Sequence, residues 1–184
     1  MGQSFEVSPG INRIFLDAQF LKFFDQQSRI SLFSRTRATT TYDGTKTDLF
    51  TGGYVNYSTA SGVGGTVVGR ISSTATGVDV GVHFFKAKRA FMVFALPSIQ
   101  LQKDLFYSWF SILKFTPGIN DNWKMYNSLE LYSAFGSQGH LASVQRIRVG
   151  MDRKGYQFGL ALEVLARRTS SGELDAGIFL RKQF

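Results

Sequence analysis

Arginine side chains recur two residues apart at two places in the sequence. Arg35 and Arg37 form one pair, and Arg146 and Arg148 form the other. Alternate residues of a β-strand point to the same face, so each pair would hold two guanidinium groups side by side if its segment is a strand. Fixed positive charge in a narrow passage of low dielectric attracts anions. The chemistry predicted from these four residues is therefore recognition of negative charge.

More charged residues lie on the polar side of segments in which apolar and polar residues alternate, and we expect them to share one interior with the arginine pairs. The predicted interior, anion-binding set is Arg35, Arg37, Arg70, Lys124, Glu130, Arg146, Arg148, Glu163 and Arg167. Basic residues outnumber acidic residues in this set. An alternative is that the carboxylates and guanidiniums pair off and fill the interior, since unpaired charges in a dry interior are costly.

Two histidines, His83 and His140, could supply acid–base chemistry. His140 stands three residues before Ser143, and a Ser–His pair could attack an ester. In a regular strand, positions three apart face opposite sides, so we predict no catalytic residue. The acids and histidines do not recur at metal-ligand spacing and the chain has no Cys, so we predict no metal site and no cofactor.

We expect β-strands to position these residues, and the pattern of the segment from Trp123 to Phe184 is the main reason. It contains consecutive stretches in which apolar and polar residues alternate, each closed by a short polar turn. In the stretch 156–167, one side reads Tyr, Phe, Leu, Leu and Val, while the other begins Gln, Gly, Ala and Glu. Each stretch therefore predicts a strand with one apolar face and one polar face.

Which face points inward decides the class of protein. A soluble barrel or sandwich buries the apolar face, whereas a membrane barrel exposes it to lipid. Aromatic residues near both ends of the apolar rows, as in Trp123 with Phe135, are typical of the girdles of membrane barrels. The polar rows are rich in Gly, Ala and Ser, and the chain has 18 Phe, which a lipid-facing belt would use. We predict the membrane barrel and keep a soluble all-β barrel as the alternative.

The composition excludes several other classes. The chain has 184 residues, and it holds no apolar run of the roughly 18 residues that a transmembrane helix needs. Its formal net charge is +8, but no basic cluster lies on a helix and no zinc-finger or RNP-like spacing appears, so we predict no nucleic-acid partner. No signal peptide is seen, and the start Met-Gly-Gln is typical of an expression start placed before a mature N-terminus.

The last eight residues, GIFLRKQF (Gly177–Phe184), resemble the terminal strand of Gram-negative outer-membrane β-barrels, which typically ends on Phe. Lys182 departs from that pattern, because those strands usually carry an apolar or aromatic residue there. The segments 31–57 (SLFSRTRATTTYDGTKTDLFTGGYVNY) and 139–162 (GHLASVQRIRVGMDRKGYQFGLAL) are similar to small Bacteroidota-type outer-membrane barrel proteins of uncharacterised function. The resemblance implies a barrel in the bacterial outer membrane and no assigned activity.

We therefore expect an all-β fold, a single antiparallel transmembrane β-barrel of about ten to twelve strands with short turns. Twelve strands are favoured, because single-chain bacterial barrels have an even number and the residues around 5–7 could supply the last one. The expected division is a leader at 1–10 and one barrel domain at 11–184. Asp43-Gly44 predicts a type I′ hairpin turn, and Lys86–Arg89 predicts a basic turn. The segments 90–101 and 105–117 are apolar on both sides, so their facing is left open between a subunit contact and a locally aromatic interior.

The function predicted first is a narrow passive channel in the bacterial outer membrane, with a positively biased interior that passes small anionic solutes. The alternative is a closed barrel that serves as a structural or accessory subunit of a larger outer-membrane assembly, with Ala90–Pro117 as its contact with other envelope proteins. A lipid-modifying enzyme that uses His140 at the rim is the third hypothesis. Outer-membrane lipid, or detergent in its place, is the expected surrounding of the barrel in each case.

Overall fold

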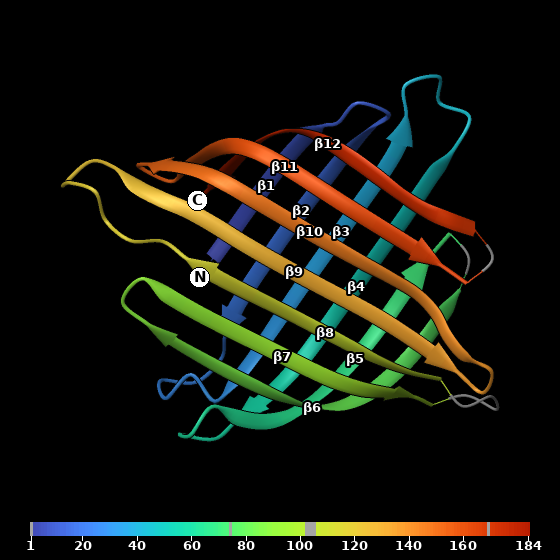
Figure 1. Cartoon of the computed structure of the whole chain (residues 1–184). Helices are drawn as coiled ribbons and strands as arrows, with labels where there is room; N and C mark the ends of the chain where they lie inside the picture. Colours follow the sequence, from blue (N-terminus) through green and yellow to red (C-terminus); the bar gives the residue numbers. More distant parts are fainter. Residues whose placement is uncertain (1, 74, 102–105, 169) are drawn as a thin grey trace.

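The chain closes into one antiparallel barrel of twelve strands (Figure 1). The computed structural model describes residues 2–73, 75–101, 106–168 and 170–184. The strands are β1 (Gly2–Pro9), β2 (Arg13–Phe23), β3 (Ile30–Thr41), β4 (Thr47–Ser58), β5 (Val63–Ser72), β6 (Thr76–Lys88), β7 (Phe91–Gln100), β8 (Phe106–Phe115), β9 (Lys124–Gly136), β10 (Gly139–Arg153), β11 (Tyr156–Arg167) and β12 (Ser170–Gln183). Each strand pairs with the next along the chain, and β12 closes the barrel on β1. The prediction of a twelve-stranded barrel is confirmed, and the even number of strands places both termini at one end.

Most polar side chains of the strands point into the barrel, and most apolar side chains point out of it. Arg35 and Glu130 expose 2% and 5% of their surface, whereas Leu160 and Ile178 expose 68% and 58%. A soluble barrel would show the opposite distribution. The predicted arrangement of a membrane barrel, with its apolar face outward, is therefore confirmed. No helix in the described part of the chain is long and apolar enough to cross a membrane.

The first strand comes from the residues that the sequence assigns to a leader. Phe5 and Val7 point outward on β1, while Ser4, Glu6 and Ser8 are buried on its inner side. Pairing runs antiparallel to β2 on one edge and to β12 on the other. Residues 2–9 are thus part of the barrel wall, and Glu6 becomes an interior carboxylate.

Two turns differ from their predictions. Only Gly44 has a positive φ in the β3–β4 connection, which spans residues 42–46, so the predicted two-residue type I′ turn at Asp43-Gly44 is wrong. The Asp43 carboxylate accepts a hydrogen bond from the Thr41 hydroxyl and others from Thr45, which hold the pKa of Asp43 below its usual value and stabilise the longer turn.

The predicted basic turn at Lys86–Arg89 is also too long. Strand β6 continues through Lys88, which pairs with Phe91 of β7. A two-residue connection at 89–90, with Arg89 at a φ of 46°, is enough to reverse the chain. The basic residues before it therefore belong to the barrel wall.

The doubly apolar strands β7 and β8 fill part of the barrel interior. Leu96 and Phe110 point inward and form a buried cluster with Tyr54 and Val68. Outward residues of the same two strands, such as Trp109, are largely exposed. The structure thus assigns the facing that the sequence leaves open, and the interior here holds an apolar cluster beside buried polar residues such as Ser98 and Ser108. Leu105, the expected start of the second segment, lies outside the described residues.

The last strand accommodates its unusual lysine at the rim. Lys182 points outward on β12, and its ammonium group lies 3.5 Å from the centre of the Tyr156 ring. Its Nζ atom also lies 3.5 Å from the Lys154 carbonyl oxygen in the β10–β11 turn. The long side chain thus keeps its charge at the edge of the apolar surface, as lysines near membrane interfaces do.

Candidate functional site in the barrel interior

A single carboxylate joins three arginines at the centre of the barrel. Glu130 on β9 accepts hydrogen bonds from Nη1 of Arg35 at 2.6 Å, from Nη2 of Arg37 at 2.7 Å and from Nη1 of Arg146 at 3.0 Å. Arg35 also donates through Nε and Nη2 to both oxygens of Asp17, at 2.7 and 2.9 Å. All five side chains come from alternate, inward positions of β2, β3, β9 and β10. Glu130 is the hub of the interior charges, because each of its oxygens binds at least one guanidinium.

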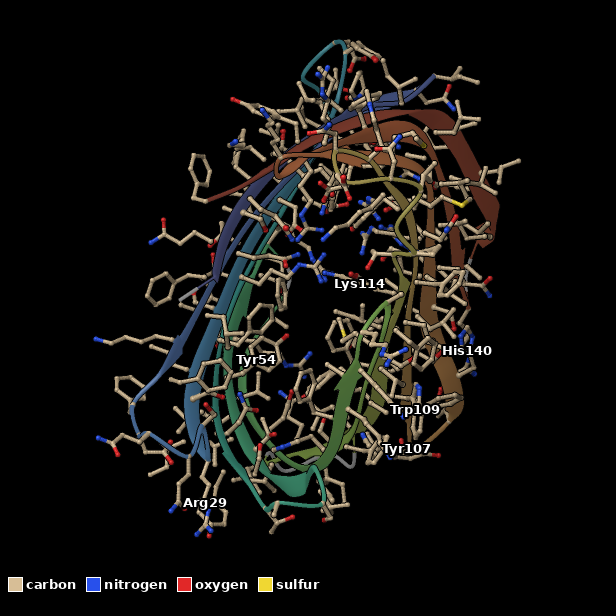
Figure 2. The ribbon with its side chains drawn as sticks, turned by 90° about the vertical axis from the view of Figure 1, so that its left-hand side faces the viewer. Arg29, Tyr54, Tyr107, Trp109, Lys114 and His140 are labelled. Carbon is tan, nitrogen blue, oxygen red and sulfur yellow. The ribbon has the colours of Figure 1, made fainter. Side chains whose placement is uncertain are left out.

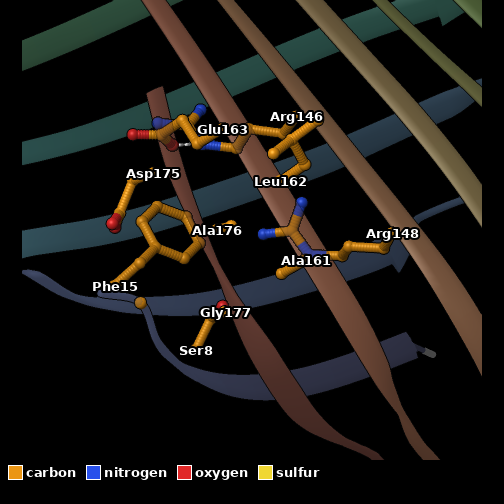
Figure 3. A pocket seen from close by; sticks show the side chains of 11 residues that line it. Ser8, Phe15, Arg146, Arg148, Ala161, Leu162, Glu163, Asp175, Ala176 and Gly177 are labelled. Carbon is orange, nitrogen blue, oxygen red and sulfur yellow. Dashed lines mark hydrogen bonds and ion pairs between the residues drawn. The ribbon is translucent and has the colours of Figure 1, made fainter. Parts of the chain in front are cut away.

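The network continues toward the end of the barrel that lies opposite the termini. Arg146 pairs with Glu163, and the guanidinium of Arg13 lies 3.4 Å from Glu163 and 3.5 Å from Asp175. A cavity of about 20 Å³, close to the room one water needs, lies beside these side chains. Figure 3 shows the Phe15 ring in the same place, 4.7 Å from the guanidinium carbon of Arg146. Ion pairs and one aromatic ring therefore fill this region.

A second group of ion pairs lies around Glu6. Arg148 donates from Nε to Oε1 of Glu6 at 2.6 Å, and Nη1 of Arg181 lies 3.7 Å from Oε2 of the same carboxylate. Arg181 also donates to the hydroxyl groups of Tyr126 and Ser4. These contacts tie β1 to β10 and β12, so they connect the two ends of the chain.

The interior divides into two halves with different chemistry. The charged half comprises the inner faces of β1–β3 and β9–β12 and holds the two groups of ion pairs. The half with fewer charges, here called the apolar half, comprises the inner faces of β4–β8. It holds the cluster of Tyr54, Val68, Leu96 and Phe110 beside buried uncharged polar side chains such as Asn56, Thr66 and Ser98. Among the described residues its one ion pair is Arg70 with Asp79, at 3.0 Å, and the Arg70 guanidinium lies 4.7 Å from the centre of the Phe106 ring.

One interior cation has no carboxylate partner. Lys114 points inward from β8, next to the charged half, and Figure 2 shows it inside the ring of strands with Tyr54 on the opposite wall. No described Asp or Glu oxygen lies within 4.0 Å of its ammonium group, although ion pairs hold every arginine of the two groups above. Among the described residues, Lys114 is therefore an inward basic group without a carboxylate partner.

The predicted interior set divides in the structure. Arg35, Arg37, Arg146, Arg148, Glu130 and Glu163 lie in the charged half, and Arg70 lies in the apolar half. Lys124 is exposed at the start of β9, and Arg167 is 49% exposed at the end of β11, where it reaches Asp48 at 3.5 Å. These last two stand at the rims rather than among the buried charges.

Seven interior charges lie outside the predicted set, and they are Glu6, Arg13, Asp17, Asp79, Lys114, Asp175 and Arg181. Glu6 stands in the supposed leader, Arg13 at the first residue of its strand, and Lys114 in a segment apolar on both sides. The alternation of Ser4, Glu6 and Ser8 is the one signal that could have revealed Glu6 from the sequence.

The prediction that Ser143 and His140 face opposite sides of β10 is wrong. The register of β10 on β9 shifts between His140 and Ala142, so Leu141 is an extra residue in the strand. This bulge places the two side chains on the same outer face, where the His140 Nε2 atom lies 2.6 Å from the Ser143 Oγ atom. His83 lies inside the barrel, and its Nε2 atom lies 2.8 Å from Oγ of Ser58.

Metal ligation finds no support within residues 2–73, 75–101, 106–168 and 170–184. Nowhere in this part of the chain do three His, Asp or Glu side chains group in a way that could hold a metal ion. The interior carboxylates instead form ion pairs with guanidinium groups, which would compete with a metal ion for the same oxygens. The chemistry that the arrangement supports is charge recognition.

Several solved structures share this architecture. The KdgM porin aligns over 100% of this chain and 98% of its own, with a TM-score of 0.58 and 8% identity. The NanC porin aligns over the same shares with a TM-score of 0.57 and 9% identity, and LpxR from Salmonella typhimurium over 100% and 99% with 0.54 and 9%. No protein-family model matches the sequence, and no curated protein does either. At these identities the likeness shows the fold, which is that of Gram-negative outer-membrane β-barrels, and a Bacteroidota origin stays a prediction.

Proposed function

We propose that this barrel is a narrow, passive channel of the bacterial outer membrane that favours small anions. The observation that carries the proposal is Lys114, whose ammonium group points into the interior without a carboxylate within 4.0 Å among the described residues. A free cation in a passage of low dielectric lowers the energy of an anion there and raises that of a cation.

The balance of interior charge supports the same preference. Counting the rims, inward cations outnumber inward carboxylates by one in the described part of the chain. The cations are Arg13, Arg35, Arg37, Arg70, Lys114, Lys124, Arg146, Arg148, Arg167 and Arg181, and the carboxylates are Glu6, Asp17, Asp48, Asp79, Glu130, Asp152, Glu163, Glu173 and Asp175. Ion pairs neutralise most of this charge, so the excess acts mainly through Lys114.

Unsatisfied polar atoms around Arg181 support a hydrated path. Oε2 of Glu6, Nε of Arg181 and Oε1 of Gln157 are buried and have no hydrogen-bond partner among the described residues. Arg181 pairs directly with Glu6 on one side and with Gln157 on the other, so the three atoms belong to neighbouring positions of β1, β12 and β11. Buried polar atoms of this kind normally bind water or a solute.

A neighbour in fold adds to this proposal. The KdgM porin is also known in complex with disordered oligogalacturonate, and that structure aligns over 100% of this chain with 8% identity. Galacturonate units carry carboxylates, so the same architecture holds an anionic solute in that protein. We propose the same chemical class of solute here, small carboxylates or other small anions.

Conductance across a planar bilayer tests the proposal. Pure protein in a KCl gradient should give discrete openings whose reversal potential shows preference for chloride. Lys114→Glu replaces the free cation with an anion and should shift the reversal potential toward potassium, because the same position then attracts cations. Lys46→Glu makes the same charge change in the exposed β3–β4 turn and should shift it far less. Equal shifts in the two variants would contradict a role for Lys114.

The ion pairs of the charged half favour a second candidate function, a closed barrel in a larger outer-membrane assembly. They fill the region around Arg146 down to a cavity of about 20 Å³. Outward residues of the Ala90–Pro117 region, such as Phe91, Ile99 and Trp109, are 45–51% exposed and would form the contact. Pure protein without conductance, together with crosslinks from Ile99→Cys to another envelope protein in whole membranes, would support this candidate over the channel.

A further inference from the structure

A polar patch interrupts the apolar outer surface of β9 and β10. His140, Ser143 and Gln145 point outward from β10, and Ser133 points outward from β9 directly opposite Ser143. Their neighbours on the same face are apolar, such as Ile147, which is 37% exposed. Polar and ionisable groups that face lipid are costly, so they usually mark a functional site.

The β-bulge at Leu141 creates this patch. Without the extra residue, His140 and Ser143 would point to opposite faces of β10, because side chains alternate along a strand. With it, the His140 ring and the Ser143 hydroxyl share the outer face and lie 2.6 Å apart, measured from Nε2 to Oγ. Bulges often re-aim a side chain next to a site of chemistry.

Aromatic packing and a second serine hold the pair in place. The His140 ring packs edge-on against Phe135 at 5.6 Å between centroids, and Phe135 stacks on Tyr107 at 5.4 Å. Ser133 Oγ lies 3.0 Å from Ser143 Oγ. Figure 2 shows Tyr107, Trp109 and His140 along the same side of the wall. The imidazole and the serine are thus oriented before any ligand arrives.

The pair lies close to one rim of the barrel. His140 stands at the beginning of β10, next to the rim that lies opposite the termini. Ser143 pairs with Ala166 on the neighbouring strand β11. Arg168 follows Ala166 by two residues, which is roughly 7 Å closer to the rim. The Arg168 side chain is exposed there and donates to Gln138 at 2.9 Å. An exposed guanidinium at the rim suits a lipid phosphate, and the acyl esters of a lipid bound there would lie below it, toward Ser143.

We propose that Ser143 and His140 form an esterase site that hydrolyses an ester-linked acyl chain of a membrane lipid. Ser143 Oγ attacks the ester carbonyl carbon while His140 Nε2 takes the hydroxyl proton. The tetrahedral intermediate expels the lipid alcohol oxygen, which takes that proton from His140 and leaves an acyl-serine. Water then attacks the acyl-serine with His140 as base, and its collapse releases the fatty acid and restores Ser143. Gln145 and Ser133 offer donors on the same face for the oxyanion.

Lipid vesicles test the proposal. Pure protein is reconstituted with a phospholipid that carries a labelled acyl chain, and in parallel with labelled lipopolysaccharide, and the released fatty acid is measured. We expect release from one of the two lipids, which identifies the ester. Ser143→Ala should abolish release, and His140→Ala should lower it at least ~100-fold, the usual contribution of a general base. Ser58→Ala, which removes a Ser–His contact of 2.8 Å inside the barrel, is the matched control and should keep the rate within about twofold of the wild type.

A labelling experiment separates chemistry from folding. A fluorophosphonate reacts with a serine that a histidine activates, so mass spectrometry should find the adduct on Ser143 in the wild type and not in His140→Ala. Circular dichroism checks that both variants keep the barrel. No release from either lipid by the wild type, or full release by Ser143→Ala, would overturn the proposal. These readouts do not depend on conductance, so they stand apart from the test of the channel.

Discussion

The charged half and the apolar half of the barrel interior stabilise the same wall in different ways. In the charged half, Glu130 alone holds three guanidiniums, so the loss of one group leaves several others unpaired. In the apolar half, side chains such as Leu96 and Phe110 fill space without a preferred partner. Ionic partners specify which strand positions face each other, whereas apolar packing tolerates changes of shape. The difference predicts that the two halves respond unequally to similar substitutions.

Removal of the hub carboxylate should have the largest effect on stability. Glu130→Ala leaves the guanidiniums of Arg35, Arg37 and Arg146 without their shared partner. Breaking a buried ion pair in this way costs about 3–5 kcal/mol of unfolding free energy. Urea titration of the barrel in lipid vesicles, followed by tryptophan fluorescence, measures the loss. Asp121→Ala, in the exposed β8–β9 turn, is the control, and a loss below about 1 kcal/mol for Glu130→Ala would mean that solvent screens the hub.

A cavity in the apolar half should cost somewhat less. Leu96 is 2% exposed within the cluster of the apolar half, and Leu96→Ala removes packing that neighbours only partly replace, at about 2–4 kcal/mol. The same titration measures it, and 1 M KCl should leave this loss unchanged because no charge is involved. Leu160→Ala is the same truncation on the outer face, where Leu160 is 68% exposed, and should cost far less. Similar losses at the two leucines would contradict a packed interior.

The isolated ion pair of the apolar half should be replaceable almost without loss. Arg70 and Asp79 pair with each other at 3.0 Å, away from the Glu130 hub. The double variant Arg70→Met with Asp79→Leu replaces the pair with apolar groups and should change the unfolding free energy by about 1 kcal/mol or less. Asp79→Leu alone should be clearly destabilising, because it leaves the charge of Arg70 without a carboxylate and with only the hydrogen bond to Gln100. A double variant as unstable as the single one would show that Arg70 serves more than this pair.

The strand pattern could be predicted from the sequence because alternation is a local property. Strand β11 spans the predicted residues 156–167. Where one side of a strand is polar, the same alternation also predicts which side chains face the barrel interior. In β7 and β8 both sides are apolar, so only the closed barrel decides which side faces in.

The contacts of the interior could not be predicted in the same way. Glu130 meets Arg35 across 95 residues of sequence, and Glu6 meets Arg148 across 142, which depends on where each strand lies around the barrel. The bulge at Leu141 has no signature in the sequence, since it is one extra residue in a strand of ordinary composition. Strict alternation therefore predicts opposite faces for Ser143 and His140, because that rule holds only for strands without a bulge.

The pairing of β1 with β12 has a consequence for how the protein is made. Until the last strand arrives, both margins of the growing sheet keep unpaired amide and carbonyl groups, a state that invites association with other chains. Bringing residues near positions 4 and 183 together is the longest loop closure in the molecule, and its entropic cost falls at the end of assembly. Loss of β12 alone should therefore turn the closed barrel into an open sheet with two unpaired edge strands, which is prone to aggregate even when the other strands form correctly.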